Sequence, residues 1–60
     1  MKPNATIKEW SVERNRLVGV VTEHETRKEL IGVRVVTSEI VSLTSSTCET
    51  NNTVYKLIGD

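Results

Sequence analysis

The sequence has one cysteine, one histidine, no phenylalanine and no apolar run longer than a few positions. One thiol excludes a disulfide within the chain, and one Cys with one His cannot form a four-ligand zinc site. The apolar runs fall far below the roughly 20 residues that a membrane-spanning helix needs. A lone thiol without an apolar leader indicates the cytoplasm, and the sequence predicts no membrane contact.

Neither basic nor acidic residues are in excess. Eight basic residues balance eight acidic ones, so the formal net charge is zero. Proteins that bind nucleic acid through its phosphates normally carry a clear basic excess. The balance therefore argues against nucleic acid as a partner.

Good helix formers are also scarce, with one Ala, four Leu and no Gln. In contrast, nine Val, four Ile and eight Thr are present. Branched side chains lose rotamer freedom in helices and pack well in strands. The composition predicts a single small all-β domain over residues 1–60.

A chain of 60 residues buries only roughly 60% of the surface that its unfolded form exposes. Small domains usually compensate with disulfides, a structural metal or oligomerisation. The first two are excluded by the counts of Cys and His. We therefore expect the chain to form a homo-oligomer.

The pattern of apolar residues and turn residues predicts a five- or six-stranded antiparallel meander, either barrel-like or an open sheet. The expected strands cover residues 6–12, 17–24, 33–38, 40–44, 48–50 and 53–58. Trp10 and Val12 are expected on one face of the first strand and Ile7 on the other. Residues 25–30 are expected to form a long loop with one helical turn, and a bend is expected near Glu39.

Two turns have recognisable residues. Asn15 suits the left-handed conformation in the polar break between the first two strands. Asn51 and Asn52 in succession favour a two-residue type I′ turn between the last two strands. Both segments therefore predict hairpins.

Several strands carry apolar residues on both faces, for example residues 17–21 and 33–36. Strands of that kind need cover on both sides. Closing the sheet into a small barrel covers one face. Since the sequence offers no amphipathic helix for the other, we expect another subunit to cover it.

Residues with catalytic chemistry are few, and the sequence predicts that the protein is not an enzyme. His24 stands between Glu23 and Glu25, but neighbouring strand residues point to opposite faces. We therefore interpret it mainly as a solvated strand end rather than as a metal ligand. Cys48 has no histidine nearby in sequence to activate it. No cofactor and no metal are expected.

A ligand site is the more economical hypothesis. Trp10 and Tyr55 are the two aromatic residues, and an aromatic face can stack on a nucleobase. Arg34 interrupts an apolar strand, and Arg pairs well with phosphate. Thr37 and Ser38 offer hydroxyl and backbone N–H groups to an anion.

Each of these residues also has a structural interpretation. Trp10 is equally suited to anchor a core or an interface. Arg34 can pair with a glutamate across the sheet, the candidates being Glu9, Glu23 and Glu49. Thr37 and Ser38 also suit an ordinary strand and turn.

The sequence also carries a family resemblance, spread over nearly the whole chain in short motifs. These are Trp10-x-Val12, Leu17-x-Gly19-x-Val21, Thr37-Ser38-x-Ile40-Val41 and Thr50-x-Asn52-x-x-Tyr55-x-Leu57. Their order resembles small proteins of phages and prophages, in particular the β-rich core of phage anti-Thoeris sponge proteins. The longer members of that family carry additional helices that this sequence lacks.

The resemblance implies a non-enzymatic phage anti-defence protein. Such a protein sequesters a nucleotide-derived immune signal, a cyclic nucleotide or a molecule of the cyclic ADP-ribose type, in pockets between subunits. The positions that would face such a pocket are Arg34, Thr37, Ser38, Asn52 and Tyr55. The alternatives are a small oligomeric β module that binds a host protein or single-stranded nucleic acid, and a structural β-protein without a ligand.

Overall fold

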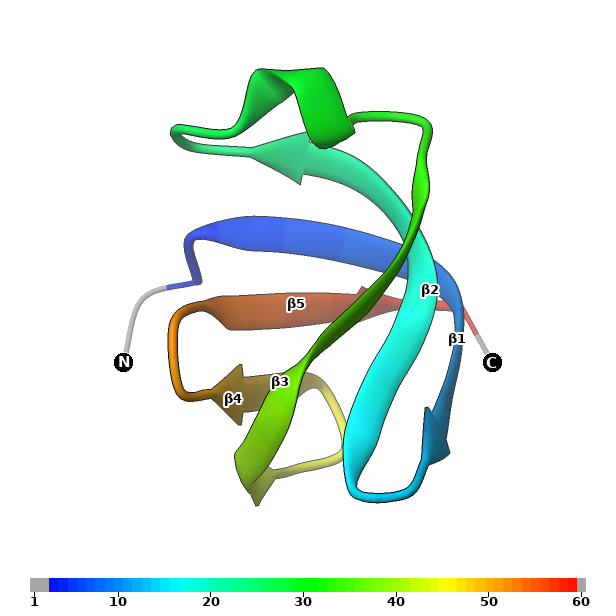
Figure 1. Cartoon of the computed structure of the whole chain (residues 1–60), viewed down its shortest axis with the longest axis vertical. Coiled ribbons are helices and arrows are strands. Elements are labelled where there is room, and N and C mark those ends of the chain that lie inside the picture. The colour runs from blue at the N-terminus through cyan, green and yellow to red at the C-terminus, as the bar shows by residue number, and fades with distance from the viewer. Residues whose placement is uncertain (1–2, 60) are drawn as a thin grey trace.

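The computed structural model describes residues 3–59 and shows five strands that close into a barrel (Figure 1). The strands are β1 (Ala5–Glu13), β2 (Arg16–His24), β3 (Arg34–Leu43), β4 (Thr47–Thr50) and β5 (Val54–Ile58). A short 3-10 helix, η1 (Lys28–Leu30), lies between β2 and β3, within the loop that the sequence predicts to hold one helical turn. No helix in the described residues is long and apolar enough to cross a bilayer.

The barrel is mixed, so the prediction of a purely antiparallel sheet is wrong. Strands that follow each other in sequence pair antiparallel, whereas β1 and β5 pair parallel, with Ala5 opposite Tyr55 and Ile7 opposite Leu57. The reason is that the barrel has an odd number of strands. Strand direction alternates along a meander, so the first and fifth strands run the same way when they meet. The all-β class and the barrel are confirmed.

The core lies inside the barrel and is small. Its fully buried side chains are Ile7, Leu17, Val21 and Cys48. Gly19 lies among them, and a Cβ there would come within 2.9 Å of Ile7 Cγ1 and of the Lys8 carbonyl oxygen. The absence of a side chain at Gly19 therefore lets β1 pass close to β2.

A bulge in β1 reverses the expected alternation of its side chains. Glu9 has a positive φ of 51°, and the pairing with β2 shifts between Lys8 and Ser11. An extra residue in one strand of a pair turns the following side chains to the other face. As a result, Trp10 packs against the same core cluster that contains Ile7. The expectation that Trp10 and Ile7 lie on opposite faces is wrong for this reason.

One of the two predicted hairpin turns has the expected backbone conformation, and the other does not. Between β1 and β2, Arg14 and Asn15 have φ of 52° and 62°, as a type I′ turn requires, so the prediction for Asn15 is confirmed. Asn51 and Asn52 are not among the described residues with positive φ. The prediction of a type I′ turn there is wrong.

The third strand is continuous, so the expected bend that separates two strands near Glu39 is wrong. Its pairing with β2 shifts between Val36 and Glu39, which marks an irregularity around Thr37 and Ser38. The Thr37 hydroxyl accepts the Leu17 N–H at 3.0 Å. Because this side chain replaces a ladder carbonyl, the pairing register shifts while β3 continues. The prediction of an irregular segment near Glu39 thus has a counterpart at Thr37 and Ser38, but its division into two strands is wrong.

The outside of the barrel carries exposed apolar side chains, as the two-faced strands predict. Val36 is 64% exposed and Val41 60% exposed, both on β3. In the described residues the only helical segment is η1, which is far too short to cover a sheet face. This surface is open in a single chain.

Candidate ligand-binding site

Two hollows lie on either side of His24, which lines both. The first has a volume of about 580 Å³ and lies between the start of β1, the end of β2 and the loop that follows. The second has a volume of about 330 Å³ and lies between β3, the β4–β5 turn, β5 and the same loop. The loop of residues 25–33 therefore forms a wall of each.

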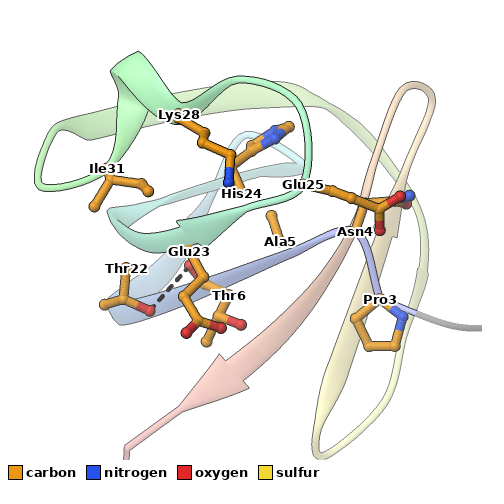
Figure 2. A pocket seen from close by; sticks show the side chains of 10 residues that line it. All are labelled: Pro3, Asn4, Ala5, Thr6, Thr22, Glu23, His24, Glu25, Lys28 and Ile31. Atoms are coloured by element: carbon orange, nitrogen blue, oxygen red, sulfur yellow. Dashed lines mark hydrogen bonds between the residues drawn. The ribbon is translucent and has the colours of Figure 1, made fainter.

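The first hollow is an open groove whose charges do not converge (Figure 2). Glu23 and Glu25 are both exposed, and they extend from separate parts of the groove. The Thr22 hydroxyl is already used, since it donates to the Thr6 carbonyl at 3.4 Å. Pocket-like sites for small ligands normally direct several polar groups at one point. This groove does not have that arrangement.

The second hollow has more of the expected character. It is lined by His24, Thr26, Arg27, Leu30, Ser38, Thr50, Asn52, Thr53 and Tyr55. Three of the six residues predicted to bind a ligand are among them, namely Ser38, Asn52 and Tyr55. They come from β3, the β4–β5 turn and β5, so the fold brings together residues that are up to 17 positions apart in sequence.

Ser38 has an unusual hydroxyl. Its Oγ is shielded from solvent and has no hydrogen-bond partner in the part of the chain that the structure describes. A buried polar atom without a partner costs about 1–3 kcal/mol. Since no hydrogen bond holds the rotamer of Ser38, a rotation about χ1 can turn the hydroxyl toward a ligand in the hollow.

Tyr55 contributes a neutral hydroxyl. The residue is 6% exposed, and burial raises the pKa of its phenol above the ordinary value. The phenol is therefore protonated at neutral pH and can donate a hydrogen bond. The same burial leaves little of its ring free for stacking.

His24 is buried and structural, so its interpretation as a solvated strand end is wrong. It is 9% exposed, and its Nδ1 accepts the N–H groups of Thr26 and Arg27 at 3.2 and 2.9 Å. With Nδ1 as acceptor, the proton of the neutral ring is on Nε2. The imidazole thereby fixes the loop that separates the two hollows.

Among residues 3–59, Arg27 is the one arginine or lysine that lines the second hollow. Its Nε donates to a Glu29 carboxylate oxygen at 2.7 Å. This hydrogen bond raises the pKa of Arg27 and lowers that of Glu29. Both side chains are exposed, so the pair exchanges readily with solvent and its guanidinium remains accessible to an anion.

The other predicted site residues lie outside both hollows. Trp10 is partly buried against the core, as its structural interpretation predicts. Thr37 is buried, and its hydroxyl also donates to the Ser38 carbonyl at 2.9 Å. Arg34 is exposed and paired opposite Val20. It makes no ion pair with a described glutamate.

Sequence reasoning missed Thr50 and Thr53 as lining residues, and also His24, Thr26, Arg27 and Leu30. A partial signal for the first two exists, because Thr-x-x-Thr occurs three times, at 44–47, 47–50 and 50–53. The first and last copies span tight turns, whereas 47–50 is strand β4. For His24 we find no such signal. Its position depends on how the loop folds back, which local sequence does not specify.

Groups for covalent or metal chemistry are not assembled in the described residues. Cys48 is fully buried, and burial raises the pKa of its thiol, so the nucleophilic thiolate is disfavoured. No group of three or more His, Cys, Asp or Glu in residues 3–59 could hold a metal ion. The second hollow is therefore best described as a polar hollow that is rich in hydroxyl groups.

No family model, curated protein or solved structure matches this chain. The function is therefore argued from the geometry of the second hollow.

Proposed function

We propose that this protein is a non-enzymatic binding module that sequesters a small nucleotide-derived molecule, with the second hollow as its site. The observation that carries the proposal is the convergence of Ser38, Asn52 and Tyr55 on one hollow, where the Ser38 hydroxyl is shielded from solvent and has no partner in the described residues. The anti-defence role in a phage, with a cyclic nucleotide or a molecule of the cyclic ADP-ribose type as ligand, follows from the resemblance of the motifs.

The lining groups suit a ligand that is rich in hydroxyls and phosphate. Tyr55 donates a hydrogen bond, whereas Ser38 and Thr53 can each donate or accept one. Arg27 can exchange the Glu29 carboxylate for a phosphate, to which guanidinium binds in a bidentate manner. Since these groups bind without supplying a nucleophile, the ligand is held and released unchanged.

The size of the hollow favours a shared site. A volume of about 330 Å³ is at the lower end of the roughly 300–1,000 Å³ typical of small-molecule sites. One chain can therefore enclose part of a nucleotide-sized molecule. Assembly of several copies would complete the enclosure, in agreement with the homo-oligomer expected from the size of the chain.

Single-stranded nucleic acid is the weaker alternative. Sequence-tolerant binders of this kind stack bases on exposed aromatic rings and neutralise phosphates with excess basic charge. Here Tyr55 is buried and Trp10 packs against the core, while the net charge is zero. Neither requirement is met.

The proposal is tested with cyclic dinucleotides, cyclic AMP and cyclic ADP-ribose isomers, each at up to millimolar concentration. We expect at least one to raise the Tm by several degrees, since a ligand at about 100 times its Kd stabilises the folded state by about 2.7 kcal/mol. Recovery of the unchanged molecule after heat denaturation is expected, because the protein binds without cleaving. If no molecule of the panel shifts the Tm, the proposal is wrong.

The site is tested by Ser38→Ala, with Ser42→Ala on the same strand as the matched control, since Ser42 is exposed. We expect Ser38→Ala to weaken binding about tenfold, which corresponds to about 1.4 kcal/mol, while leaving stability unchanged or higher because an unpartnered hydroxyl is removed. Ser42→Ala should bind like the unmodified chain. Equal affinity of both variants would place the ligand elsewhere.

A further inference from the structure

The outer surface of the β1–β2–β3 sheet carries a row of paired residues across three strands, and two of its three residues are valines. Ser11 pairs with Val18, and Val18 pairs with Val36, and directly paired residues face the same side of a sheet. Leu17 and Gly19 on either side of Val18 are buried, so this row points outward. We call it the central row.

Charged rows lie on both sides of the central row. Toward one end of the sheet, Lys8 pairs with Val20, which pairs with Arg34, so this row has a basic residue at each edge. Toward the other end, Glu13 pairs with Arg16, which pairs with Glu39, so this row has an acidic residue at each edge. These residues make up the basic row and the acidic row.

The four edge charges are Lys8, Arg34, Glu13 and Glu39, and all four are exposed. Within residues 3–59 the one ion pair joins Arg27 to Glu29, so none of the four has a charged partner. Arg16 lies between the two glutamates of the acidic row and keeps its positive charge, while its Nη1 donates to the Thr37 carbonyl at 3.3 Å. The basic row therefore has a net charge of +2 and the acidic row a net charge of −1, and the two valines of the central row lie between them.

The spacing of the rows is symmetric about Val18. Val20 and Arg16 are each two residues from Val18 along β2, which corresponds to about 7 Å on either side at 3.3–3.4 Å per residue. A twofold axis that lies along the central row exchanges positions at equal distances from it. Such an axis brings the basic row of one copy over the acidic row of the other.

We propose that this face binds a second copy of the chain in an isologous, face-to-face dimer. Its twofold axis runs along the central row, Val18 and Val36 meet their counterparts, and two charge pairs form at each end. Lys8 lies against the partner's Glu13, and Arg34 lies against the partner's Glu39. The aliphatic stem of Arg16 covers the partner's Val20.

The opposite arrangement is disfavoured by the same charges. A twofold axis parallel to the strands would place Lys8 over the partner's Arg34 and Glu13 over the partner's Glu39. Like charges that meet across an interface cost several kcal/mol. The charge pattern thus selects one orientation and identifies the chain itself as the complementary surface.

The small surface of the chain limits the area of the contact. An interface of standard size would bury about 800 Å² on each partner, which is about a fifth of the 4064 Å² that this chain exposes. We expect a dimer in the micromolar range that is weakened by salt, because exposed ion pairs are screened. This interface contains none of the residues that line the second hollow, so the dimer does not complete that site and does not require a ligand.

The experiment is sedimentation velocity of the full chain without ligand, from about 5 to 500 µM, in 50 and 500 mM NaCl. We expect a reversible monomer–dimer equilibrium whose Kd rises several-fold at the higher salt concentration. A monomer at all concentrations, or a trimer or larger ring, would contradict the proposal. Because no ligand is present, this outcome is independent of the nucleotide-binding test.

Charge-reversal variants distinguish this specific interface from non-specific association. Arg34→Glu and Glu39→Arg are each expected to raise the Kd of the dimer at least tenfold, and the double variant is expected to restore it. Lys56→Glu, an exposed reversal on β5, is the matched control and should leave the Kd unchanged. Failure of the double variant to restore association, with folding verified by circular dichroism, would show that the pairing is wrong.

Discussion

The β1–β2 turn and the turns at either end of β4 solve the same problem in different ways. Arg14 and Asn15 reverse the chain with two consecutive positive φ values. In the β3–β4 turn, by contrast, the Thr44 hydroxyl accepts the Thr47 N–H at 3.0 Å. The Thr50 hydroxyl accepts the Thr53 N–H at 3.3 Å in the β4–β5 turn.

The difference shows that a threonine hydroxyl can close a tight turn by accepting the N–H three residues later. A turn closed in this way does not need residues with positive φ. The hydroxyl takes the place of the carbonyl that normally closes the turn, as Ser and Thr do in side-chain-closed turns. Thr50 also donates to the Thr53 carbonyl at 3.0 Å. One side chain therefore satisfies two backbone groups, and Asn51 and Asn52 need no positive φ.

The largest effect on this comparison is expected from Thr50→Val. Thr50 is only 4% exposed. Removal of its hydroxyl therefore leaves the Thr53 N–H without an acceptor, and water cannot easily reach this N–H to replace it. We expect the free energy of unfolding to fall by roughly 1–3 kcal/mol, measured by urea denaturation. Thr44→Val is the matched variant at an exposed turn and should cost less than about 1 kcal/mol. Equal losses would mean that burial does not distinguish the two turns.

A smaller change of opposite sign is expected from Arg14→Asn. Arg14 is exposed and held at a φ of 52°, a conformation that Asn adopts more readily. The free energy of unfolding should rise by about 0.5–1 kcal/mol. Asn52→Gly should instead lower it slightly, because Gly adds unfolded-state entropy where no positive φ needs relief. A gain at both positions would show that the turns are alike after all.

The smallest expected effect is on the pH dependence of the stability of the fold. It involves titratable groups on β4 and β5, two of the strands that the threonine turns join. Burial raises the pKa of Cys48 on β4 and of Tyr55 on β5, so the folded chain retains these protons to higher pH than the unfolded chain. Stability is therefore complete below the ordinary pKa of the thiol and falls as pH rises above about 8.5. Urea midpoints at pH 7, 9 and 10 should show a shallower decline for Cys48→Ala. An unchanged slope would exclude the thiol as a cause.

Much of the fold could be predicted, because it depends on local patterns. The density of Val, Ile and Thr predicts strands, and the break at Glu13–Arg16 predicts the first hairpin. The apolar residues on both faces of β2 and β3 predict an apolar exterior. The bulge at Glu9 could not be predicted, because a glutamate in the left-handed region is disfavoured locally and is held there by the surrounding pairing.

The candidate site was predictable only in part. Residue type predicts Ser38 and Tyr55 as binding residues, whereas Asn52 is predicted only by the resemblance of the motifs. The structure places all three around the second hollow. Trp10 and Thr37 were not separable from structural residues by type, since the same ring or hydroxyl serves either purpose. The role of His24 depends on contacts of its Nδ1 with the following loop, which only the folded chain establishes.

The parallel seam between β1 and β5 has a consequence for how the molecule assembles. Ala5 meets Tyr55 across it, so this pairing must wait until β5 has been synthesised. Before then, the free side of β1 is an unpaired strand edge, and such edges recruit other chains. We expect a ribosome-bound nascent chain to close its barrel only after β5 has emerged, and truncation before Val54 to leave it open to aggregation.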